Sequence, residues 1–226
     1  MVLRIGHRGA AGYEPENTLR SFQEAVRLGA DMTELDVHVC DTGEIVVIHD
    51  ESVERTTNGS GFIHDMTLNE LKSLDAGMGE KIPTLIEVLS ALHGLISVNI
   101  ELKGVGTAEP VKEIIDGLVH HGGWDRNDVI VTSFDWRMLK RFKEVSPETR
   151  VGVLVYDNLD DALRVATEVG AYSINPFHHK IDESFINRSH KLNLKVYPWT
   201  VNNVEEIRRV LGFGVDGVIS DYPDRI

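Results

Sequence analysis

The sequence is poor in cysteine, in basic residues and in long apolar runs. A single cysteine, Cys40, among 226 residues excludes an intramolecular disulfide framework. Lys and Arg number 23 against 36 Asp and Glu, which gives a formal net charge of −13. Such a chain lacks the basic surplus that nucleic acids and anionic membrane surfaces require. No run reaches the roughly 18 apolar residues of a transmembrane helix. We therefore expect no nucleic-acid partner and no stable membrane association.

The remaining composition is typical of a globular protein. Hydrophobic residues make up 42% of the chain and charged residues 26%, which is too apolar for intrinsic disorder. The first residues lack the charged lead, the apolar run and the small-residue cleavage site of a signal peptide. The expectation is a cytoplasmic protein.

Short apolar runs alternate with segments of helical period along the chain. Strands are predicted at residues 3–6, 32–39, 45–48, 95–102, 129–132, 151–155, 171–174, 194–199 and 216–220. Only five residues separate the second run from the third, whereas a parallel crossover needs a dozen or more. The third run must therefore return antiparallel, through a turn at Asp41, Thr42 and Gly43.

Removal of this hairpin arm leaves eight parallel strands alternating with helices. That pattern predicts a (β/α)8 barrel that forms a single domain over residues 1–226. An open doubly wound sheet is the competing architecture, but no Gly-x-Gly-x-x-Gly turn follows the first strand.

Polar residues gather at the C-terminal ends of the predicted strands, where barrel enzymes place their chemistry. Glu34 and Asp36 stand two apart on one strand and share a face, as do Glu101 and Lys103 on the neighbouring strand. Three carboxylates in one barrel mouth repel one another. A hard divalent cation with oxygen ligands, Mg²⁺ or Ca²⁺, relieves that repulsion. The alternative is an ion-pair network with Arg8 and Lys103.

Two histidines are predicted to flank this site. A two-residue turn at Thr42 and Gly43 pairs positions that sum to 85 and sets His49 opposite Asp36. His7 ends the adjacent first strand. One imidazole can then accept a proton while the other donates one, as in-line displacement at phosphorus requires.

Three other polar groups carry weaker signals. His38 shares a face with Asp36 and is a weaker site candidate. His178 and His179 follow the strand at 171–174, where a plain surface loop is the expectation. Asp221 lies near barrel closure and has three possible partners, which are His7, Arg8 and a backbone amide.

Ordered motifs along the chain resemble those of the glycerophosphodiester phosphodiesterase family. They are His7-Arg8-Gly9, Pro15-Glu16-Asn17-Thr18, Glu34-Leu35-Asp36-Val37, Val47-Ile48-His49-Asp50, Arg55-Thr56-Thr57-Asn58-Gly59, Glu101-Leu102-Lys103, Ser133-Phe134-Asp135, Asn175-Pro176, Trp199-Thr200-Val201-Asn202 and Ser220-Asp221-Tyr222-Pro223. One tripeptide would be a weak signal, whereas the ordered set spans essentially the whole chain and is specific.

The resemblance implies an enzyme that hydrolyses glycerophosphodiesters to sn-glycerol 3-phosphate and an alcohol. The implied site residues are Glu34, Asp36 and Glu101 as metal ligands, His7 and His49 as the general acid/base pair, Arg8 and Lys103 as phosphate contacts, and Trp199 as lining of the substrate site. The sequence does not show which histidine is the acid and which the base, and our hypothesis is His7 as base and His49 as acid. Residues 51–83 match the family's small cap-like insertion, which we expect not to form a separate domain. The hairpin turn departs from the family, because a basic residue near the mouth is lost while Gly43 is kept.

Three alternatives keep the barrel and change the chemistry. A metal-independent phospholipase C of the phosphatidylinositol-cleaving kind has the histidine pair but needs no cluster of three carboxylates. An amidohydrolase requires His-x-His after the first strand, where this chain has His7-Arg8-Gly9. A non-catalytic phosphodiester-binding barrel predicts a lost site residue, and none is missing. The sequence does not name the head-group alcohol, the choice between Mg²⁺ and Ca²⁺, or the oligomeric state.

Overall fold

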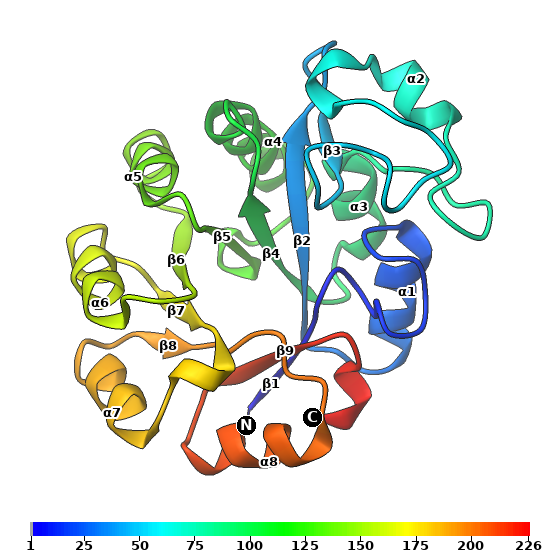
Figure 1. Ribbon diagram of the computed structural model, residues 1–226. Helices are drawn as coiled ribbons and strands as arrows, with labels where there is room; N and C mark the ends of the chain where they lie inside the picture. The colour runs from blue at the N-terminus through cyan, green and yellow to red at the C-terminus, as the bar shows by residue number, and fades with distance from the viewer. Residues whose placement is uncertain (1) are drawn as a thin grey trace.

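The computed structural model describes residues 2–226 and places eight parallel strands in a ring (Figure 1). Around the ring the strands are β1 Leu3–Gly6, β2 Met32–Val39, β4 Ser97–Leu102, β5 Val129–Ser133, β6 Arg150–Val155, β7 Ser173–Pro176, β8 Lys195–Val196 and β9 Gly217–Ser220, while β3 Ile45–Val47 pairs only with β2. Backbone hydrogen bonds close the ring, because Asp216 N donates to Val196 O at 3.1 Å and Ile219 N donates to Pro198 O at 3.0 Å. The prediction of a (β/α)8 barrel is confirmed.

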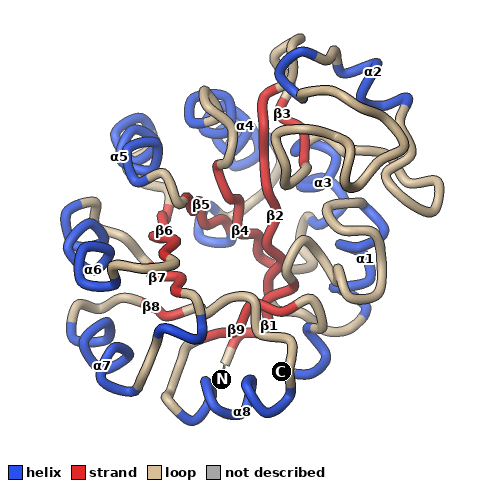
Figure 2. The backbone as a smooth tube through the Cα atoms, viewed as in Figure 1, coloured by secondary structure: helices blue, strands red, loops and turns tan. Residues whose placement is uncertain are grey.

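Helices surround this ring of strands (Figure 2). They are α1 Leu19–Arg27, α3 Leu85–Leu92, α4 Ala108–His121, α5 Trp136–Val145, α6 Leu159–Glu168, α7 Glu183–Lys191 and α8 Val204–Gly212. Their apolar faces pack with the outer faces of the strands in one large cluster of buried side chains. The Thr18 side chain caps α1 by accepting from Ser21 N, and Gly29 follows the helix with a φ of +79°.

The inside of the barrel changes from apolar to acidic along its length. Met32 packs with Ile5, Ile130 and other apolar side chains in a plug within the ring. The next inward positions on β2 are Glu34 and Asp36, because side chains two apart share a face. The plug makes the barrel a packed core, and the polar end of the strands is left for the functional site.

The hairpin formed by β2 and β3 is antiparallel, as predicted, but its predicted register is wrong by one residue. Val37 pairs with Val47, so paired positions sum to 84 and not to 85. Ile48 therefore lies opposite Asp36, and its N donates to Asp36 O at 3.0 Å. His49 lies one position beyond Ile48, after the last residue of β3.

The cause of this shift is a loop of three residues in place of two. Cys40 N donates to Glu44 O at 3.0 Å, and Gly43 N donates to Cys40 O at 2.9 Å. Gly43 has a φ of +93°, the left-handed conformation with which three-residue hairpin loops end. The glycine that favours a turn thus also allows the longer loop.

Residues 51–83 form the insertion after the hairpin and lie to one side of the barrel, beyond β3 (Figure 1). The segment contains a 3₁₀ turn at Ile63–Asp65 and helix α2 Leu68–Ser73. Its buried side chains, among them Ile63 and Leu71, pack with Val46 of the hairpin. Within residues 2–226, no helix is both long and apolar enough to cross a bilayer.

Candidate active site

Three buried carboxylates meet at the C-terminal ends of β2 and β4. The strand register aligns Asp36 with Glu101, and Glu34 lies two residues earlier on β2. Ligand oxygens of the three side chains lie within 4.8 Å of one another. Their exposed fractions are 4% for Glu34, 1% for Asp36 and 7% for Glu101. The structure thus brings together the three residues that were predicted to hold a metal.

The negative charges of this cluster oppose one another. Burial raises the pKa of Glu34 well above its usual value, and the charges of Asp36 and Glu101 raise it further. Burial and Asp36 likewise raise the pKa of Glu101, against the attraction of Lys103. A cation among the three would favour their ionised forms. Three oxygen donors without sulfur or imidazole fit a hard ion such as Mg²⁺ or Ca²⁺.

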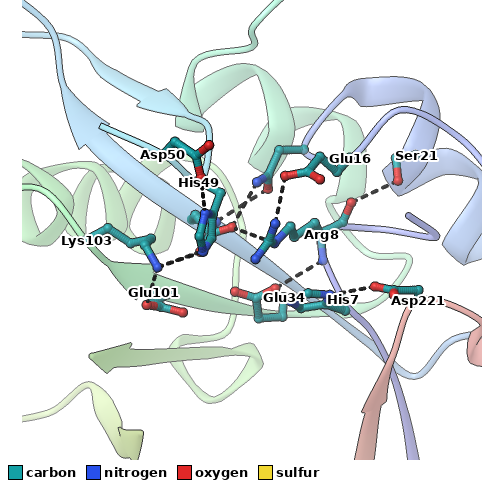
Figure 3. A network of polar contacts seen from close by, with 12 residues as sticks. His7, Arg8, Glu16, Ser21, Glu34, His49, Asp50, Glu101, Lys103 and Asp221 are labelled. Atoms are coloured by element: carbon teal, nitrogen blue, oxygen red, sulfur yellow. Dashed lines mark hydrogen bonds and ion pairs between the residues drawn. The ribbon is translucent and has the colours of Figure 1, made fainter. Parts of the chain in front are cut away.

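Arg8 and Asn17 contact this cluster from the loop after β1. Arg8 N donates to Glu34 Oε2 at 3.1 Å (Figure 3). Arg8 Nε lies 3.3 Å from Asp36 Oδ2. Burial opposes the guanidinium charge, but the surrounding carboxylates outweigh it and raise the pKa of Arg8. Asn17 lies in the same loop, and its Nδ2 donates to Asp36 Oδ2 at 2.9 Å. Both residues adopt a positive φ, an uncommon conformation that the surrounding contacts must stabilise.

His7 directly follows β1 and contacts a carboxylate from the other end of the chain. Its Nδ1 lies 2.6 Å from Asp221 Oδ1 (Figure 3). Asn202 Nδ2 donates to the second oxygen of Asp221 at 2.5 Å. Burial opposes the ionisation of Asp221, but the bonds from His7 and Asn202 outweigh it and lower the pKa of Asp221. Of the three partners considered for Asp221, the structure selects His7 and leaves the imidazole Nε2 free for proton transfer.

His49 also has a carboxylate partner, which is the next residue in the chain. Its Nδ1 lies 2.5 Å from Asp50 Oδ1, and its Nε2 lies 3.0 Å from Lys103 Nζ (Figure 3). An ammonium group only donates, so Nε2 of His49 accepts and the proton lies on Nδ1. Burial lowers the pKa of His49 despite the neighbouring Asp50, and the charges of Arg8 and Lys103 act in the same direction. His38 Nε2 lies 3.0 Å from His49 O, so His38 contacts the backbone of His49 and not the carboxylate cluster.

Arg55 of the insertion links the two sides of the site. Its Nε donates to Asp50 Oδ2 at 2.6 Å, and its Nη1 and Nη2 donate to the oxygens of Glu16 at 2.9 and 2.8 Å. Glu16 Oε1 also accepts from Arg8 Nη1 at 2.8 Å. Burial opposes the ionisation of Glu16, but the two arginines outweigh it and lower its pKa to about 2. Charged hydrogen bonds therefore run without a break from His49 to Arg8.

The cavity at this end of the barrel has a polar wall and an apolar wall. Phe134, Leu154, Trp199 and Ile219 line it from β6, β9 and the loops after β5 and β8, whereas the charged groups belong to or directly follow β1, β2, β4 and the hairpin. Trp199 Nε1 donates to Asn175 O at 2.7 Å, and the Phe134 ring meets the indole edge-on at 5.2 Å between centroids. The two walls suit a ligand that joins a charged phosphate to a short aliphatic group.

The predicted site residues converge on this one cavity. His7, Arg8, Glu34, His49, Glu101, Lys103 and Trp199 line it. Asp36 is almost completely buried, and its Oδ1 lies 3.8 Å from Lys103 Nζ. Sequence reasoning missed the contributions of Glu16, Asp50 and Arg55, although each belongs to one of the motifs. The one sequence signal that could have revealed them was Asp50, because it is a carboxylate directly after a candidate catalytic histidine.

The prediction of a plain surface loop after β7 is wrong for His178. Its side chain is only 5% exposed, and its N donates to Trp199 O at 3.2 Å. A short 3₁₀ turn at His178–Lys180 folds the first of the two histidines inward and leaves His179 exposed.

Comparisons with known proteins agree with this geometry. The sequence model of the glycerophosphoryl diester phosphodiesterase family matches residues 7–225. A glycerophosphodiester phosphodiesterase of Caldanaerobacter subterraneus is 39% identical, over 100% of this chain and 96% of its own.

Two solved structures extend the match to the fold. A phosphodiesterase of Oleispira antarctica, in complex with the product sn-glycerol-3-phosphate, matches with a TM-score of 0.88 and 30% identity, over 98% of this chain and 94% of its own. A glycerophosphodiester phosphodiesterase of Agrobacterium tumefaciens matches with a TM-score of 0.85 and 31% identity, over 100% of this chain and 98% of its own. The chain therefore belongs to the glycerophosphoryl diester phosphodiesterase family of phosphoric diester hydrolases.

Proposed function

We propose that this protein hydrolyses glycerophosphodiesters to sn-glycerol 3-phosphate and an alcohol, with Mg²⁺ or Ca²⁺ as cofactor. The observation that carries the proposal is the cavity at the barrel mouth. It combines three buried carboxylates with two histidines, each of which contacts a carboxylate of its own. The relative in complex with sn-glycerol-3-phosphate supports glycerol phosphate as the product.

Glu34, Asp36 and Glu101 are the residues that would hold the cation. When bound there, a divalent ion polarises a phosphoryl oxygen and stabilises the negative charge that develops on it. The three carboxylates, in a chain of net charge −13, otherwise repel an anionic phosphodiester. Neutralisation of this cluster is therefore a condition for substrate binding as well as for catalysis.

Arg8 and Lys103 supply the remaining positive charge for the phosphate. The guanidinium of Arg8 offers a planar set of donors, and the ammonium of Lys103 acts as a point charge. Glu16 and Asp36 hold the Arg8 side chain before substrate arrives, so little conformational entropy is lost on binding. Trp199 then packs against the aliphatic glycerol carbons on the apolar wall.

The two histidines act as a general base and a general acid. Asp221 stabilises the imidazolium that forms when His7 Nε2 takes a proton from the nucleophile, which supports His7 as the base. Burial and two nearby cations lower the pKa of His49, so its protonated form is the stronger acid and donates to the leaving alkoxide. A phosphate oxygen that draws Lys103 away frees His49 Nε2, which accepts from Lys103 in the structure and takes up a proton from solvent before it donates one to the alkoxide. The nucleophile is either the glycerol 2-hydroxyl, which gives a cyclic phosphate, or water.

A coupled assay for sn-glycerol 3-phosphate release tests the proposal. The panel contains glycerophosphodiesters of choline, ethanolamine, glycerol and inositol, each with EDTA, Mg²⁺ or Ca²⁺. We expect release that EDTA abolishes and an added divalent cation restores. Activity that survives exhaustive chelation would favour the metal-independent phospholipase C chemistry, and no release from any substrate would refute the proposal.

Single substitutions test the histidine pair. His7→Ala and His49→Ala are each expected to lower kcat by roughly 10²–10⁴-fold. His190→Ala is a matched control, because His190 also pairs with a carboxylate, Asp216, at 2.8 Å but does not line the cavity. Turnover in both site variants equal to that of the control would contradict the assignment. ³¹P NMR of the reaction detects any cyclic phosphate.

The cytoplasmic location and the absence of nucleic-acid and membrane partners stay predictions from composition. The substrate and product are small anions, which is consistent with an acidic protein that places two cationic side chains, Arg8 and Lys103, in the cavity.

A further inference from the structure

A second group of metal-ligating side chains lies outside the barrel cavity. His178 and His179 belong to the 3₁₀ turn after β7, which Figure 2 draws as a short helix. Glu206 belongs to the first turn of α8. Ligand atoms of the three residues lie within 4.8 Å of one another. We propose that His178, His179 and Glu206 bind a transition metal ion such as Zn²⁺, at a site separate from the catalytic cation.

The distances between donor atoms fit such an ion. Glu206 Oε1 lies 3.4 Å from His179 Nε2, and Glu206 Oε2 lies 3.7 Å from His178 Nδ1. Both separations exceed the usual length of an N–H···O hydrogen bond. A tetrahedral ion with bonds of about 2.0–2.2 Å places neighbouring donors about 3.3–3.6 Å apart. Small movements of exposed side-chain atoms, such as those of His179, would complete the geometry.

The inner ligand is in the protonation state that metal binding needs. His178 is buried, and burial together with the neighbouring His179 and Arg209 lowers its pKa to about 4. A metal accepts the lone pair of a neutral imidazole. Arg209 Nη2 lies 3.4 Å from His178 Nδ1, and its approach as a donor places that lone pair on Nδ1.

Arg209 is also the main electrostatic obstacle to a cation here. Its stronger hydrogen bond is to the backbone, since Nη2 donates to His178 O at 2.9 Å. That bond can persist while the weaker contact at Nδ1 yields to a metal. The Glu206 carboxylate offsets the guanidinium charge, and the half-exposed His179 leaves room for a water ligand.

The chemistry of the donors separates the two sites. Two imidazoles and one carboxylate favour Zn²⁺, Ni²⁺ or Co²⁺, whereas the three carboxylates of the catalytic cluster favour Mg²⁺ or Ca²⁺. The proposed ion would join the turn after β7 to the first turn of α8. The turn also contacts Trp199 at the mouth, since His178 N donates to Trp199 O and Phe177 packs 5.5 Å from Trp199 between ring centroids. Binding should therefore stabilise the folded protein and raise its Tm.

Titration with Co²⁺ under saturating Mg²⁺ tests the site in the full chain. We expect the wild type to bind one equivalent with the visible absorption of tetrahedral Co²⁺ coordinated by nitrogen. His179→Ala and Glu206→Gln should weaken this binding at least about tenfold. Glu205→Gln is the matched control, because Glu205 is the preceding acidic residue of the same helical turn and does not belong to the cluster.

The comparison between variants decides the outcome. Co²⁺ that displaces Mg²⁺ from the catalytic carboxylates would bind equally to all four proteins, so a difference confined to His179→Ala and Glu206→Gln supports the second site. Equal isotherms and spectra in all four proteins would overturn the proposal, as would the absence of any tetrahedral spectrum. Phosphodiesterase activity with Mg²⁺ and far-UV circular dichroism report whether each variant is folded.

Discussion

Replacement of Arg55 by Ala tests whether the insertion contributes to catalysis. Arg55 bonds to Asp50 and Glu16, which in turn hold His49 and Arg8. Without the guanidinium, each carboxylate keeps only its partner in the site and can rotate with it. We expect His49 and Arg8 to lose their fixed orientation, so that kcat falls together with phosphate affinity.

The expected size of the effect follows from the position of Arg55. Its side chain is 46% exposed, so water screens both ion pairs and we expect a loss of only about 1–2 kcal/mol in unfolding free energy. Residues that orient catalytic groups without contacting the substrate themselves typically contribute about 10–100-fold to activity. We therefore expect kcat/KM to fall about 10–100-fold, which corresponds to about 1.4–2.7 kcal/mol of transition-state stabilisation.

The assay measures kcat and KM for sn-glycerol 3-phosphate release at saturating metal, together with urea unfolding. Arg20→Ala is the matched control, because Arg20 is 50% exposed and also binds a carboxylate, Glu14, through two nitrogens. It should lose comparable stability and keep its activity. The kcat/KM of Arg55→Lys should lie between the values for Arg55→Ala and the wild type, since an ammonium cannot bind both carboxylates in the geometry of a guanidinium.

Two results would refute this reasoning. One is a kcat/KM for Arg55→Ala within about twofold of that for Arg20→Ala. The other is an activity loss in both variants that scales with their loss of stability, because the effect would then be general and would not pass through His49 and Arg8.

The remaining predictions concern the orientation of the base histidine, the stability of the protein in acid, and two glycines with positive φ. Asp221→Asn should lower kcat by roughly 10²–10⁴-fold without changing metal affinity in calorimetric titration, because an amide favours the wrong tautomer of the base histidine. The pKa of Glu16 is lowered to about 2 in the folded state. Its contribution to stability is therefore complete at pH values above the pKa of Glu16 in the unfolded chain, and it is lost as the pH falls from about 5 to 2. Over that window the wild type should lose about 2–3 kcal/mol more stability than Glu16→Gln, as urea unfolding at each pH would show; parallel curves would contradict this. Gly9→Ala should destabilise by more than about 2 kcal/mol, because a Cβ at this positive φ would lie 2.6 Å from the backbone carbon of Ser21. Gly43→Ala, with a positive φ but open space around it, should cost only about 1 kcal/mol, and equal melting temperatures for the two variants would count against the packing argument.

Local patterns in the sequence predicted the ring of strands, because each strand has a recognisable apolar pattern within a few residues. Alternation placed Glu34 and Asp36 on one face of β2, and the structure confirms that both point into the barrel mouth. The short link after Val39 required an antiparallel arm, and β3 is antiparallel. Period and spacing are properties of neighbouring residues, so no tertiary information was needed for these features.

The hairpin register shows where local reasoning ends. Both a two-residue and a three-residue loop are compatible with Asp41, Thr42 and Gly43. The choice between them shifts the pairing of β2 with β3 by one residue. The structure has the longer loop, in which Gly43 supplies the left-handed residue. The packing of Val46 with the insertion accompanies this register, and contacts of that kind are absent from the local sequence.

The sequence by itself thus determined the barrel, the family, and the residue types that gather at the mouth. Only the tertiary structure decided how those residues are held. His7 and Asp221 are 214 residues apart, and Arg55 and Glu16 are 39 apart, so no periodicity relates either pair. Their contacts exist because closure of the ring brings β1 beside β9, and because the insertion folds back onto the loop after β1. The pairing of β7 with β8 likewise brings the turn that carries the buried His178 and the exposed His179 beside α8, a juxtaposition that depends on the order of strands around the barrel.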